Sequence, residues 1–427
     1  MKRSIFALAM ACAVCSGWTA GIQGAVPACD PDDGGITLPT GFCALVVGTI
    51  EKEARHIVVG PNGDMFVSFN GRGRGNPGGI VGLRDTKGNG KADVVGEPFG
   101  TGGTTGLKLR NGYLYYATPT EIGRYKLTAG QLKPGGPAEV IVGGFPVQNQ
   151  HQDKDIAFDD RGNMYVNVGL PSNACSQPDR MPHAKGQDPC PLLEEHGGIW
   201  KFSESTPNQK FSAAARYATG MRQPVALDWH AGHLFAVMNS RDQLDTLYPE
   251  NFTAEDNANR PLEPMFRVDQ GAAFGWPYCF ADGKMNDMIL APEYGGDGKT
   301  IGRCSQFQKP VATFPAHYAP VGLMFYTGTQ FPQHYRGGAF ISFHGSWNRA
   351  PLPMAGYNIV YQPFNGENPS GKYEVFADGF KGKDPLMSPA DAAARPDGTG
   401  IGPDGSLYIT DSVHGKIWRV IYKGTGK

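Results

Sequence analysis

Residues 57–68 read Ile57-Val58-Val59-Gly60-Pro61-Asn62-Gly63-Asp64-Met65-Phe66-Val67-Ser68. An apolar run is followed by a turn containing glycine and asparagine, and then by a second run of apolar and aromatic residues. Glycine supplies the positive φ that a tight hairpin turn requires, and β-branched and aromatic residues suit a pleated, half-buried sheet. The stretch therefore predicts a β-hairpin.

This hairpin pattern recurs along the chain. Strong copies lie at residues 156–167 and 400–410, and weaker copies at 107–117, 225–238 and 323–343, which makes six with the first. Because a lone hairpin cannot bury its faces, such units must stack, and each has roughly 67 residues, enough for a four-stranded blade. The repeats predict an all-β, six-bladed β-propeller. Long helical periodicity is absent, and we expect at most one short helical turn, at residues 391–394.

The spacing of the copies is uneven, so we expect long inserted loops at residues 170–200, 240–310 and 345–400. Inserts of a propeller project mainly onto one face, where these loops would form the walls of a pocket. Closure of the ring is expected from a strand at residues 44–47 that joins the sheet of a C-terminal strand at residues 416–422. No linker separates a second domain, so residues 26–427 are predicted to form one propeller domain.

The N-terminus indicates an exported protein, and the net charge limits the classes of partner. Met1-Lys2-Arg3 precedes an apolar run at residues 4–14 and then small residues, a pattern typical of a signal peptide, which we place at residues 1–25. The run is too short to span a bilayer, and the alternative is a buried N-terminal helix. The net charge of −1 over 427 residues argues against nucleic acid or an anionic membrane as the main partner. We expect a periplasmic or secreted protein without a membrane span.

Cysteine usage agrees with export. Six cysteines follow the predicted signal peptide, and they fall in three adjacent pairs: Cys29 and Cys43, Cys175 and Cys190, Cys279 and Cys304. Sequential disulfides are the simplest pairing, although others are open. A metal site is the alternative, but no Cys-x-x-Cys follows residue 25.

Four polar clusters precede or follow predicted strands. His151 precedes the strand at Ile156, and a histidine with an ordinary pKa near about 6.5 suits general-base work; an exposed loop histidine is the alternative. Arg222 precedes the strand at Val225 and offers a planar donor fork for a carboxylate or quinone oxygen, unless it is a surface arginine in a turn. Arg395 occupies the same relative place before the last repeat. Arginines from several blades would suit a polycarboxylate ligand.

The fourth cluster is the segment from Phe343 to Arg349, which places His344, Trp347, Asn348 and Arg349 within seven residues. An aromatic ring beside hydrogen-bond donors suits a flat, polar, anionic ligand. Trp347 is otherwise a packing residue.

Several segments in this order resemble the soluble quinoprotein glucose/sorbosone dehydrogenases, the sorbosone-type branch in particular. They cover most of residues 40–425: Asn149-Gln150-His151, Ala218-Thr219-Gly220-Met221-Arg222-Gln223-Pro224, Arg241-Asp242-Gln243-Leu244, Gly275-Trp276-Pro277-Tyr278-Cys279, Pro315-Ala316-His317-Tyr318-Ala319-Pro320, His344-Gly345-Ser346-Trp347-Asn348-Arg349, and Arg395-Pro396 before Gly402-Pro403-Asp404-Gly405.

The resemblance implies a cofactor, pyrroloquinoline quinone, at the mouth of the propeller channel, with a bound calcium ion. His151 matches the family's general base and Arg222 the arginine that polarises the quinone. Gln223, which stands where the family commonly has asparagine, and Asn348, Arg349 and Arg395 are expected to bind the cofactor. Asn239 and Ser240 are expected at the calcium ion, held largely through backbone carbonyls.

These expectations describe an oxidoreductase that oxidises a sugar, of aldose or sorbosone type, or a polyol. Electrons would pass to a diffusible acceptor, a quinone or a separate cytochrome, because the sequence has no Cys-x-x-Cys-His haem site. One alternative is a non-catalytic carbohydrate-binding propeller. Another is a calcium-dependent lactonase, which would need acidic side chains converging on a metal, and such acids are not evident at the repeated strand starts.

Overall fold

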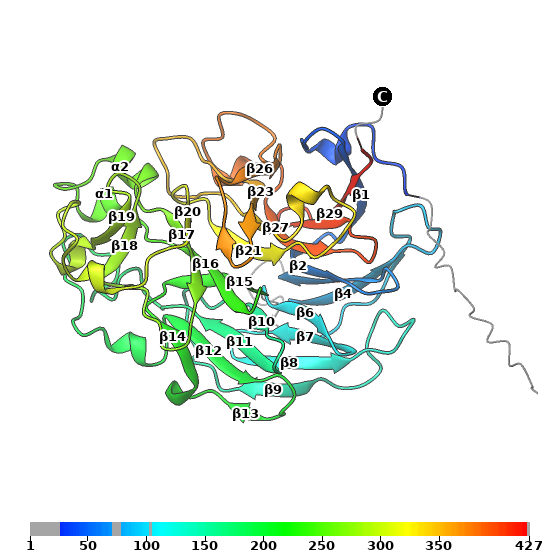
Figure 1. The fold of residues 1–427 in the computed structure, drawn as a ribbon, viewed down its shortest axis with the longest axis horizontal. Coiled ribbons are helices and arrows are strands. Elements are labelled where there is room, and N and C mark those ends of the chain that lie inside the picture. Colours follow the sequence, from blue (N-terminus) through cyan, green and yellow to red (C-terminus); the bar gives the residue numbers. More distant parts are fainter. Residues whose placement is uncertain (1–25, 71–77, 102–104, 425–427) are drawn as a thin grey trace, which may run out of the picture.

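The computed structural model describes residues 26–70, 78–101 and 105–424. Six sheets surround a central axis as the blades of a β-propeller, which confirms the predicted all-β fold (Figure 1). The predicted signal peptide lies outside the described residues.

The first three blades follow one another along the chain. Blade 1 contains β2 (Glu53–Val59), β3 (Met65–Asn70), β4 (Gly79–Arg84) and β5 (Val94–Val95). Blade 2 contains β6 (Leu107–Arg110), β7 (Tyr113–Ala117), β8 (Glu121–Lys126) and β9 (Glu139–Gly143), and it gains β13 (Gln209–Lys210) as an outer strand. Blade 3 contains β10 (Ile156–Phe158), β11 (Asn163–Val168), β12 (Gly198–Ser203) and β14 (Arg216–Thr219).

The remaining blades carry the longer loops. Blade 4 contains β15 (Gln223–His230), β16 (His233–Asn239), β17 (Glu263–Val268) and β20 (Ala312–Phe314). Blade 5 contains β21 (Pro320–Phe325), β22 (Ala339–Phe343), β23 (Asn358–Gln362) and β26 (Glu374–Ala377). Blade 6 contains β27 (Pro396–Ile401), β28 (Leu407–Asp411), β29 (Lys416–Tyr422) and β1 (Phe42–Thr49). Two short hairpins, β18 (Cys279–Asp282) with β19 (Asp287–Leu290) and β24 (Phe364–Asn365) with β25 (Asn368–Pro369), lie outside the blades.

The six sequence repeats are the first two strands of the six blades. The stretch at residues 57–68 forms the turn between β2 and β3, where Val59 pairs with Met65 and Gly63 has a φ of +85°. Ring closure also matches the prediction, because β1 pairs with β29 and Ala44 lies opposite Val420. The first strand of the propeller therefore completes the last blade.

Buried aspartates tie neighbouring inner strands together. The Asp155 carboxylate accepts a hydrogen bond from the Leu227 backbone N–H at 2.9 Å, and the Asp228 carboxylate accepts one from the Phe325 N–H at 2.8 Å. Each bond joins one blade to the next, so that the inner strands hold a fixed spacing around the channel.

Strand direction explains why the candidate residues gather at one end of the channel. Because successive strands of a blade are antiparallel, the loops after each second strand and the loops before each first strand emerge on the same face. We call this the site face. His151, Arg222 and Arg395 precede β10, β15 and β27, and the inserts after β11, β16 and β22 emerge beside them.

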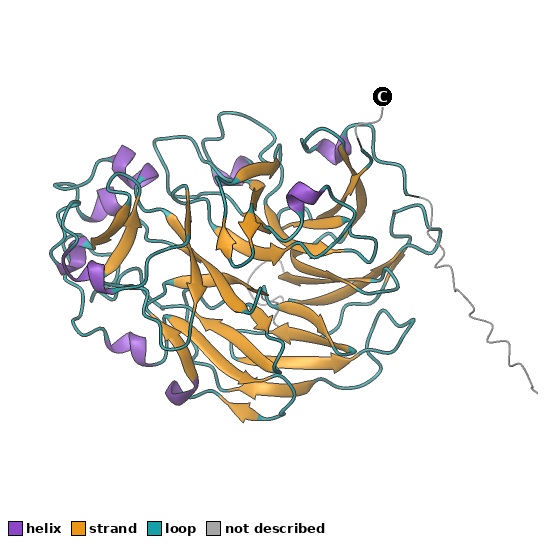
Figure 2. Cartoon of the chain, in the orientation of Figure 1, coloured by secondary structure: helices purple, strands orange, loops and turns teal. Residues whose placement is uncertain are grey.

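The inserts contain most of the irregular structure (Figure 2). The expected 240–310 insert is divided by β17, and its first part carries two short helices, α1 (Leu244–Leu247) and α2 (Ala254–Asn259), which the sequence did not predict. The expected turn at residues 391–394 is instead a 3₁₀ turn at Pro389–Asp391. Thr253 caps α2 reciprocally with Asp256, which explains how so short a helix forms. Among the described residues, no helix is long and apolar enough to cross a membrane.

All three expected disulfides are present, joining Cys29 to Cys43, Cys175 to Cys190, and Cys279 to Cys304. The second closes the insert after β11, and the third lies in the insert of blade 4.

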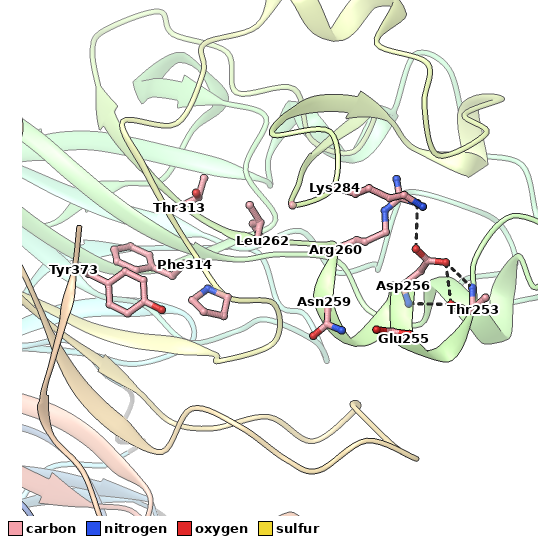
Figure 3. Close-up of a pocket in the computed structure, with 12 residues that line it drawn as sticks. Thr253, Glu255, Asp256, Asn259, Arg260, Leu262, Lys284, Thr313, Phe314 and Tyr373 are labelled. Atoms are coloured by element: carbon pink, nitrogen blue, oxygen red, sulfur yellow. Dashed lines mark hydrogen bonds and ion pairs between the residues drawn. The ribbon is translucent and has the colours of Figure 1, made fainter. Parts of the chain in front are cut away.

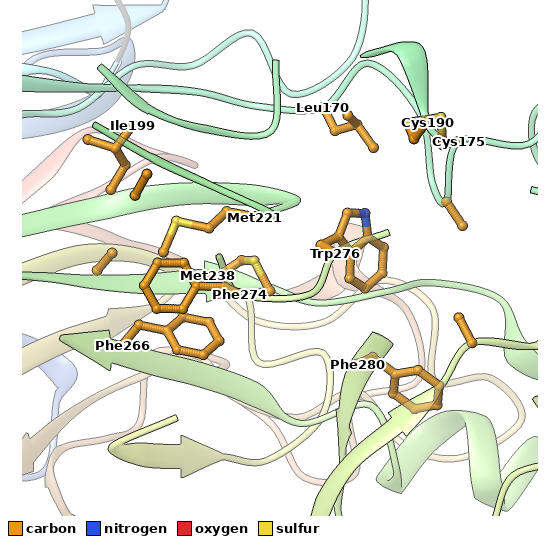
Figure 4. Close-up of a cluster of buried hydrophobic side chains, with 14 of the residues drawn as sticks. Leu170, Cys175, Cys190, Ile199, Met221, Met238, Phe266, Phe274, Trp276 and Phe280 are labelled. Carbon is orange, nitrogen blue, oxygen red and sulfur yellow. A yellow bond between two sulfur atoms is a disulfide. The ribbon is translucent and has the colours of Figure 1, made fainter. Parts of the chain in front are cut away.

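An apolar core lies below the site face between blades 3 and 4 (Figure 4). It contains Met221 and Met238 together with Phe266, Phe274 and Trp276, all at most 3% exposed. Buried side chains therefore anchor the loop that precedes β15.

Candidate active site

His151 lies on the loop between β9 and β10, and its tautomer is fixed by the insert after β11. Its Nδ1 lies 2.5 Å from the Leu170 carbonyl oxygen. A carbonyl only accepts, so Nδ1 carries the proton and Nε2 keeps its lone pair. Burial, and after it the positive charge of Arg222, lowers the pKa of His151 to about 3. The ring is therefore neutral near pH 7, and Nε2 keeps the lone pair that can accept a proton.

Arg222 lies beneath the start of β15 and is 2% exposed. Its Nη2 donates to the Asp242 Oδ2 at 2.6 Å and to the Asn173 Oδ1 at 3.1 Å. Its Nε is buried and has no hydrogen-bond partner in the described part of the chain. Burial lowers the pKa of this arginine, while Asp242 opposes that shift. Arg222 thus presents an unpaired donor on a charged group, which suits an electronegative ligand atom.

Asp242 is the centre of this network, although no role was predicted for it from the sequence. Its carboxylate also accepts from Arg180 Nη2 at 3.0 Å and from Asn348 Nδ2 at 2.8 Å. The two arginines hold the pKa of Asp242 well below its usual range against the opposing effect of burial, which is the largest single influence. His317 Nδ1 lies 4.0 Å from Asp242 Oδ1. Side chains from four separate loops therefore meet at one carboxylate.

Gln223 and Asn348 are the two amide residues expected at the cofactor. Gln223 is the first residue of β15 and pairs with Asn239 of β16. Asn348 is half-buried, and its Oδ1 has no partner among the described residues. Its carbonyl accepts from Asn257 Nδ2 at 2.9 Å, which fixes the loop on α2. The open amide oxygen of Asn348 is a second unpaired polar atom close to Asp242.

The guanidinium of Arg349 donates hydrogen bonds to oxygen atoms of the neighbouring loops. It donates to the carbonyls of Ala258, Ala316 at 3.3 Å and Pro353 at 3.1 Å, and to Asn259 Oδ1 at 3.3 Å. These bonds tie the 344–349 loop to the end of α2. The expected cofactor contact of Arg349 stays a prediction, and it would require some of these bonds to be released.

Arg395 belongs to a second polar cluster on the site face. Its Nε and Nη2 donate to the carbonyls of His344 at 2.9 Å and Gly345 at 2.7 Å. His344 Nε2 lies 2.6 Å from Ser412 Oγ. Because Arg395 holds the beginning of the 344–349 loop and Asp242 holds Asn348 further along it, this loop connects the two clusters.

Arg55 and Asp397 complete the second cluster; Arg55 was not predicted from the sequence, and Asp397 was noted beside Arg395 without a role of its own. Arg55 Nη1 lies 2.9 Å from Asp397 Oδ2, and Arg55 Nη2 lies 3.8 Å from Asp153 Oδ2. Burial raises the pKa of Asp397, and the charge of Arg55 opposes the rise. Arg55 is the third residue of β2, whereas Arg222 and Arg395 directly precede β15 and β27, so a rule based on residues before strands does not select Arg55.

Asn239 and Ser240 lie at the end of β16. Asn239 Nδ2 donates to the Pro320 carbonyl at 2.8 Å, and the Ser240 N–H donates to Glu263 Oε2 at 2.6 Å. Ser240 Oγ is buried without a partner in the described chain. In that same part of the chain, no three acidic, histidine or cysteine side chains are grouped as a metal site. A calcium ion, which takes about 6–8 oxygen ligands, would need backbone carbonyls, water or the cofactor itself.

Acidic side chains do occur at inner-strand starts, contrary to the expectation that argued against a lactonase. Asp155 precedes β10 and Asp397 is the second residue of β27. Their carboxylates are engaged, however, with backbone N–H groups and with Arg55, respectively. The described residues therefore still lack the convergent acids that a metal-dependent hydrolase requires.

Two cavities lie near these clusters without containing the main candidates. One, of about 750 Å³, lies between α2 and the outer strands of blades 4 and 5, where Asn259, Lys284, Phe314 and Tyr373 are among its lining residues (Figure 3). The other, of about 370 Å³, occupies the central channel beside His56, Lys108 and Asp228. None of His151, Arg222 and Arg395 lines either cavity.

The fold and the polar site face define a class of protein: a six-bladed propeller with arginines, amides and a neutral histidine at the channel mouth. A family model, described as TrAA12-like, matches residues 36–423 and identifies the family within this class. The chain belongs to this TrAA12-like family. The sorbosone-type branch expected from the sequence stays a prediction.

Similar proteins with known names agree with the family. A pyrroloquinoline quinone-dependent pyranose dehydrogenase of Coprinopsis cinerea is 27% identical over 160 residues, 34% of this chain and 21% of that protein. The holo form of the quinone domain of a pyranose dehydrogenase from this fungus superposes with a TM-score of 0.71 at 17% identity, covering 90% of this chain and 97% of the other. A calcium structure of a Trichoderma reesei family AA12 enzyme gives 0.72 at 19%, covering 91% and 97%.

The curated relatives are longer than the regions they share with this chain. The alignments span 48% and 21% of the first two relatives' lengths, so the chain covers half of them or less. The two solved structures are 17% and 19% identical to this chain, so their likeness establishes the fold.

Proposed function

We propose that this protein is an oxidoreductase that binds pyrroloquinoline quinone at the site face and oxidises a sugar of aldose or sorbosone type, or a polyol. The observation that carries the proposal is the pair formed by His151 and Arg222, one with a bare basic nitrogen and the other with an unpaired donor. Family membership and the named relatives support it.

The polar atoms of the site face fit such a cofactor. Three buried atoms without partners in the described chain lie in the Asp242 region: Arg222 Nε, Asn348 Oδ1 and Ser240 Oγ. Buried polar atoms are costly when unpaired, so a polar ligand here would lower the free energy of the site. Arg222 and Arg395 supply positive charge for a polyanion, with Gln223 and Asn348 as amide partners.

A bound quinone would supply the acceptor for the hydride of the substrate carbon. His151 Nε2 takes the proton of the substrate hydroxyl, because Nδ1 is committed to the Leu170 carbonyl. Arg222 donates from Nε to a developing negative oxygen, and its charge strengthens that bond in a site from which water is excluded. Asn348 and Gln223 orient the ligand, and Arg395 holds the loop that carries Asn348.

Calcium remains part of the proposal at Asn239 and Ser240, supported by the calcium-bound relative. We further propose export to the periplasm or the outside of the cell, which the three disulfides support. A diffusible quinone or a separate cytochrome would accept the electrons.

The proposal is tested with purified protein, added quinone and calcium, and an artificial dye, against a panel of aldoses, ketoaldehydes and polyols. Sugar-dependent dye reduction that needs the quinone supports the enzyme. Quinone-independent sugar binding without dye reduction would overturn it in favour of a carbohydrate-binding propeller. Lactone hydrolysis without quinone would overturn it in favour of a hydrolase.

A further inference from the structure

Asp242 follows β16 and directs its side chain into the centre of the site-face network. Its Oδ2 accepts from Arg222 Nη2 at 2.6 Å and from Arg180 Nη2 at 3.0 Å, while its Oδ1 accepts from Asn348 Nδ2 at 2.8 Å. The residue is 8% exposed. One carboxylate therefore satisfies three donors that come from three different loops.

The backbone of Asp242 is fixed as firmly as its side chain. Its N–H donates to Asn173 Oδ1 at 3.1 Å, and its carbonyl accepts from Asn173 Nδ2 at 3.1 Å. Asn173 Oδ1 also accepts from Arg222 Nη2. The insert after β11 therefore holds Asp242 and Arg222 in one rigid arrangement.

We propose that Asp242 is a positioning residue, which engages Arg222 through Nη2 and Asn348 through Nδ2. Each of these side chains is left with one unpaired polar atom for the ligand, Arg222 Nε and Asn348 Oδ1. The inference rests on the proposed function, because it assigns the quinone to those two atoms. Asp242 itself touches neither substrate nor cofactor.

Only a carboxylate can fill this place. It has two oxygens and no donor, whereas an amide of the same shape has one oxygen and an NH₂ group. Asparagine would meet at least one of the three donors with its own N–H, and it would leave the buried Arg222 without a compensating charge. The arginine fork or the Asn348 amide must then rotate, and the unpaired atoms no longer point in fixed directions.

The test compares Asp242→Asn and Asp242→Glu with wild type. The matched control is Asp282→Asn, because Asp282 is a fully buried partner of Arg260 at 2.7 Å in another loop of the same blade. Readouts are the dissociation constant of pyrroloquinoline quinone from the metal-supplemented apo-protein, the absorption spectrum of the bound quinone, kcat and KM for the sugar, and thermal unfolding.

We expect Asp242→Asn to weaken quinone binding at least about tenfold and to lower kcat more than it raises the sugar KM, since one charge-assisted bond is lost on each side. Asp242→Glu keeps the charge and should recover part of the affinity, so it reports on the geometry even where the Asn variant unfolds. Asp282→Asn should lose stability and keep the quinone affinity.

Unchanged quinone affinity and kcat in Asp242→Asn would overturn the inference and leave the proposed function intact. An equal loss of affinity in Asp282→Asn would also overturn it, because the effect would then reflect general destabilisation. No quinone binding by wild type would overturn the proposed function, and this inference with it.

Discussion

His151 and Arg222 are joined through a single residue, Leu170. The Leu170 carbonyl accepts from His151 Nδ1 at 2.5 Å, and the Leu170 N–H donates to the Arg222 carbonyl at 2.7 Å. The base and the arginine come from different blades, yet both bind the backbone of one residue at the start of the blade-3 insert. Any change that moves Leu170 should move both.

Substituting Gly169 should displace His151 without altering a polar group. A Cβ on Gly169 would lie 2.4 Å from the His151 carbonyl oxygen and 2.6 Å from its Cβ, which no ordinary contact allows. We expect Gly169→Ala to reduce kcat by at least about tenfold, because small displacements of a positioned base are costly. Gly143→Ala is the control, since its Cβ would meet nothing closer than 3.7 Å. Equal kcat values in both variants would show that the loop tolerates the displacement.

The disulfide between Cys175 and Cys190 should support the site as well as the fold. It closes the insert that carries Asn173 and Arg180, two partners of the Asp242 network. Replacing both cysteines by serine should cost about 3 kcal/mol of stability and also weaken quinone binding. The control replaces Cys29 and Cys43, which close a similar loop in blade 6. This control variant should lose stability and keep its quinone affinity, as denaturant unfolding and quinone titration would show.

Acidification should destabilise the fold through its buried histidines. Burial lowers the pKa of His56 to about 4, so between pH 6.5 and 4 the unfolded chain binds a proton that the folded chain does not. Stability is therefore full above about pH 6.5 and falls as the pH drops, for His56 by about 2–3 kcal/mol between pH 7 and 4.5. His56→Gln keeps a donor for the Val321 carbonyl and should flatten the dependence of the urea midpoint on pH. An unchanged slope would exclude His56 as a source.

Arg349 and Arg222 should respond differently to removal of their charge. Arg349 donates to three backbone carbonyls and one amide oxygen, so Arg349→Met should lower the unfolding temperature and leave most of the quinone affinity. Arg222→Met should abolish most of the affinity. A larger loss of affinity in the Arg349 variant would restore its expected role at the cofactor.

The sequence was sufficient for the propeller because its signal is local. Each repeat, such as residues 57–68, contains both strands and the turn of one hairpin, and each disulfide joins cysteines adjacent in sequence. The strand that closes the ring could also be predicted, since β1 and β29 lie at the two ends of the chain.

Three of the predicted site residues, His151, Arg222 and Arg395, were found because each precedes an inner strand. Arg55 lies within β2 and was not found by that rule. Asp242 could not be ranked, because its importance comes from Asn173, Arg180 and Asn348, which lie up to 106 residues away. The direction of the Arg349 side chain depends on α2, a helix too short to show periodicity.

The most direct test of His151 and the quinone is the rate at which sugar reduces the bound cofactor, followed by absorbance in a rapid-mixing experiment with wild type and His151→Gln. We predict that both proteins bind the quinone with similar affinity and that reduction of the bound quinone is at least about 100-fold slower in the variant. Equal reduction rates would contradict it, because a glutamine side chain cannot accept the hydroxyl proton.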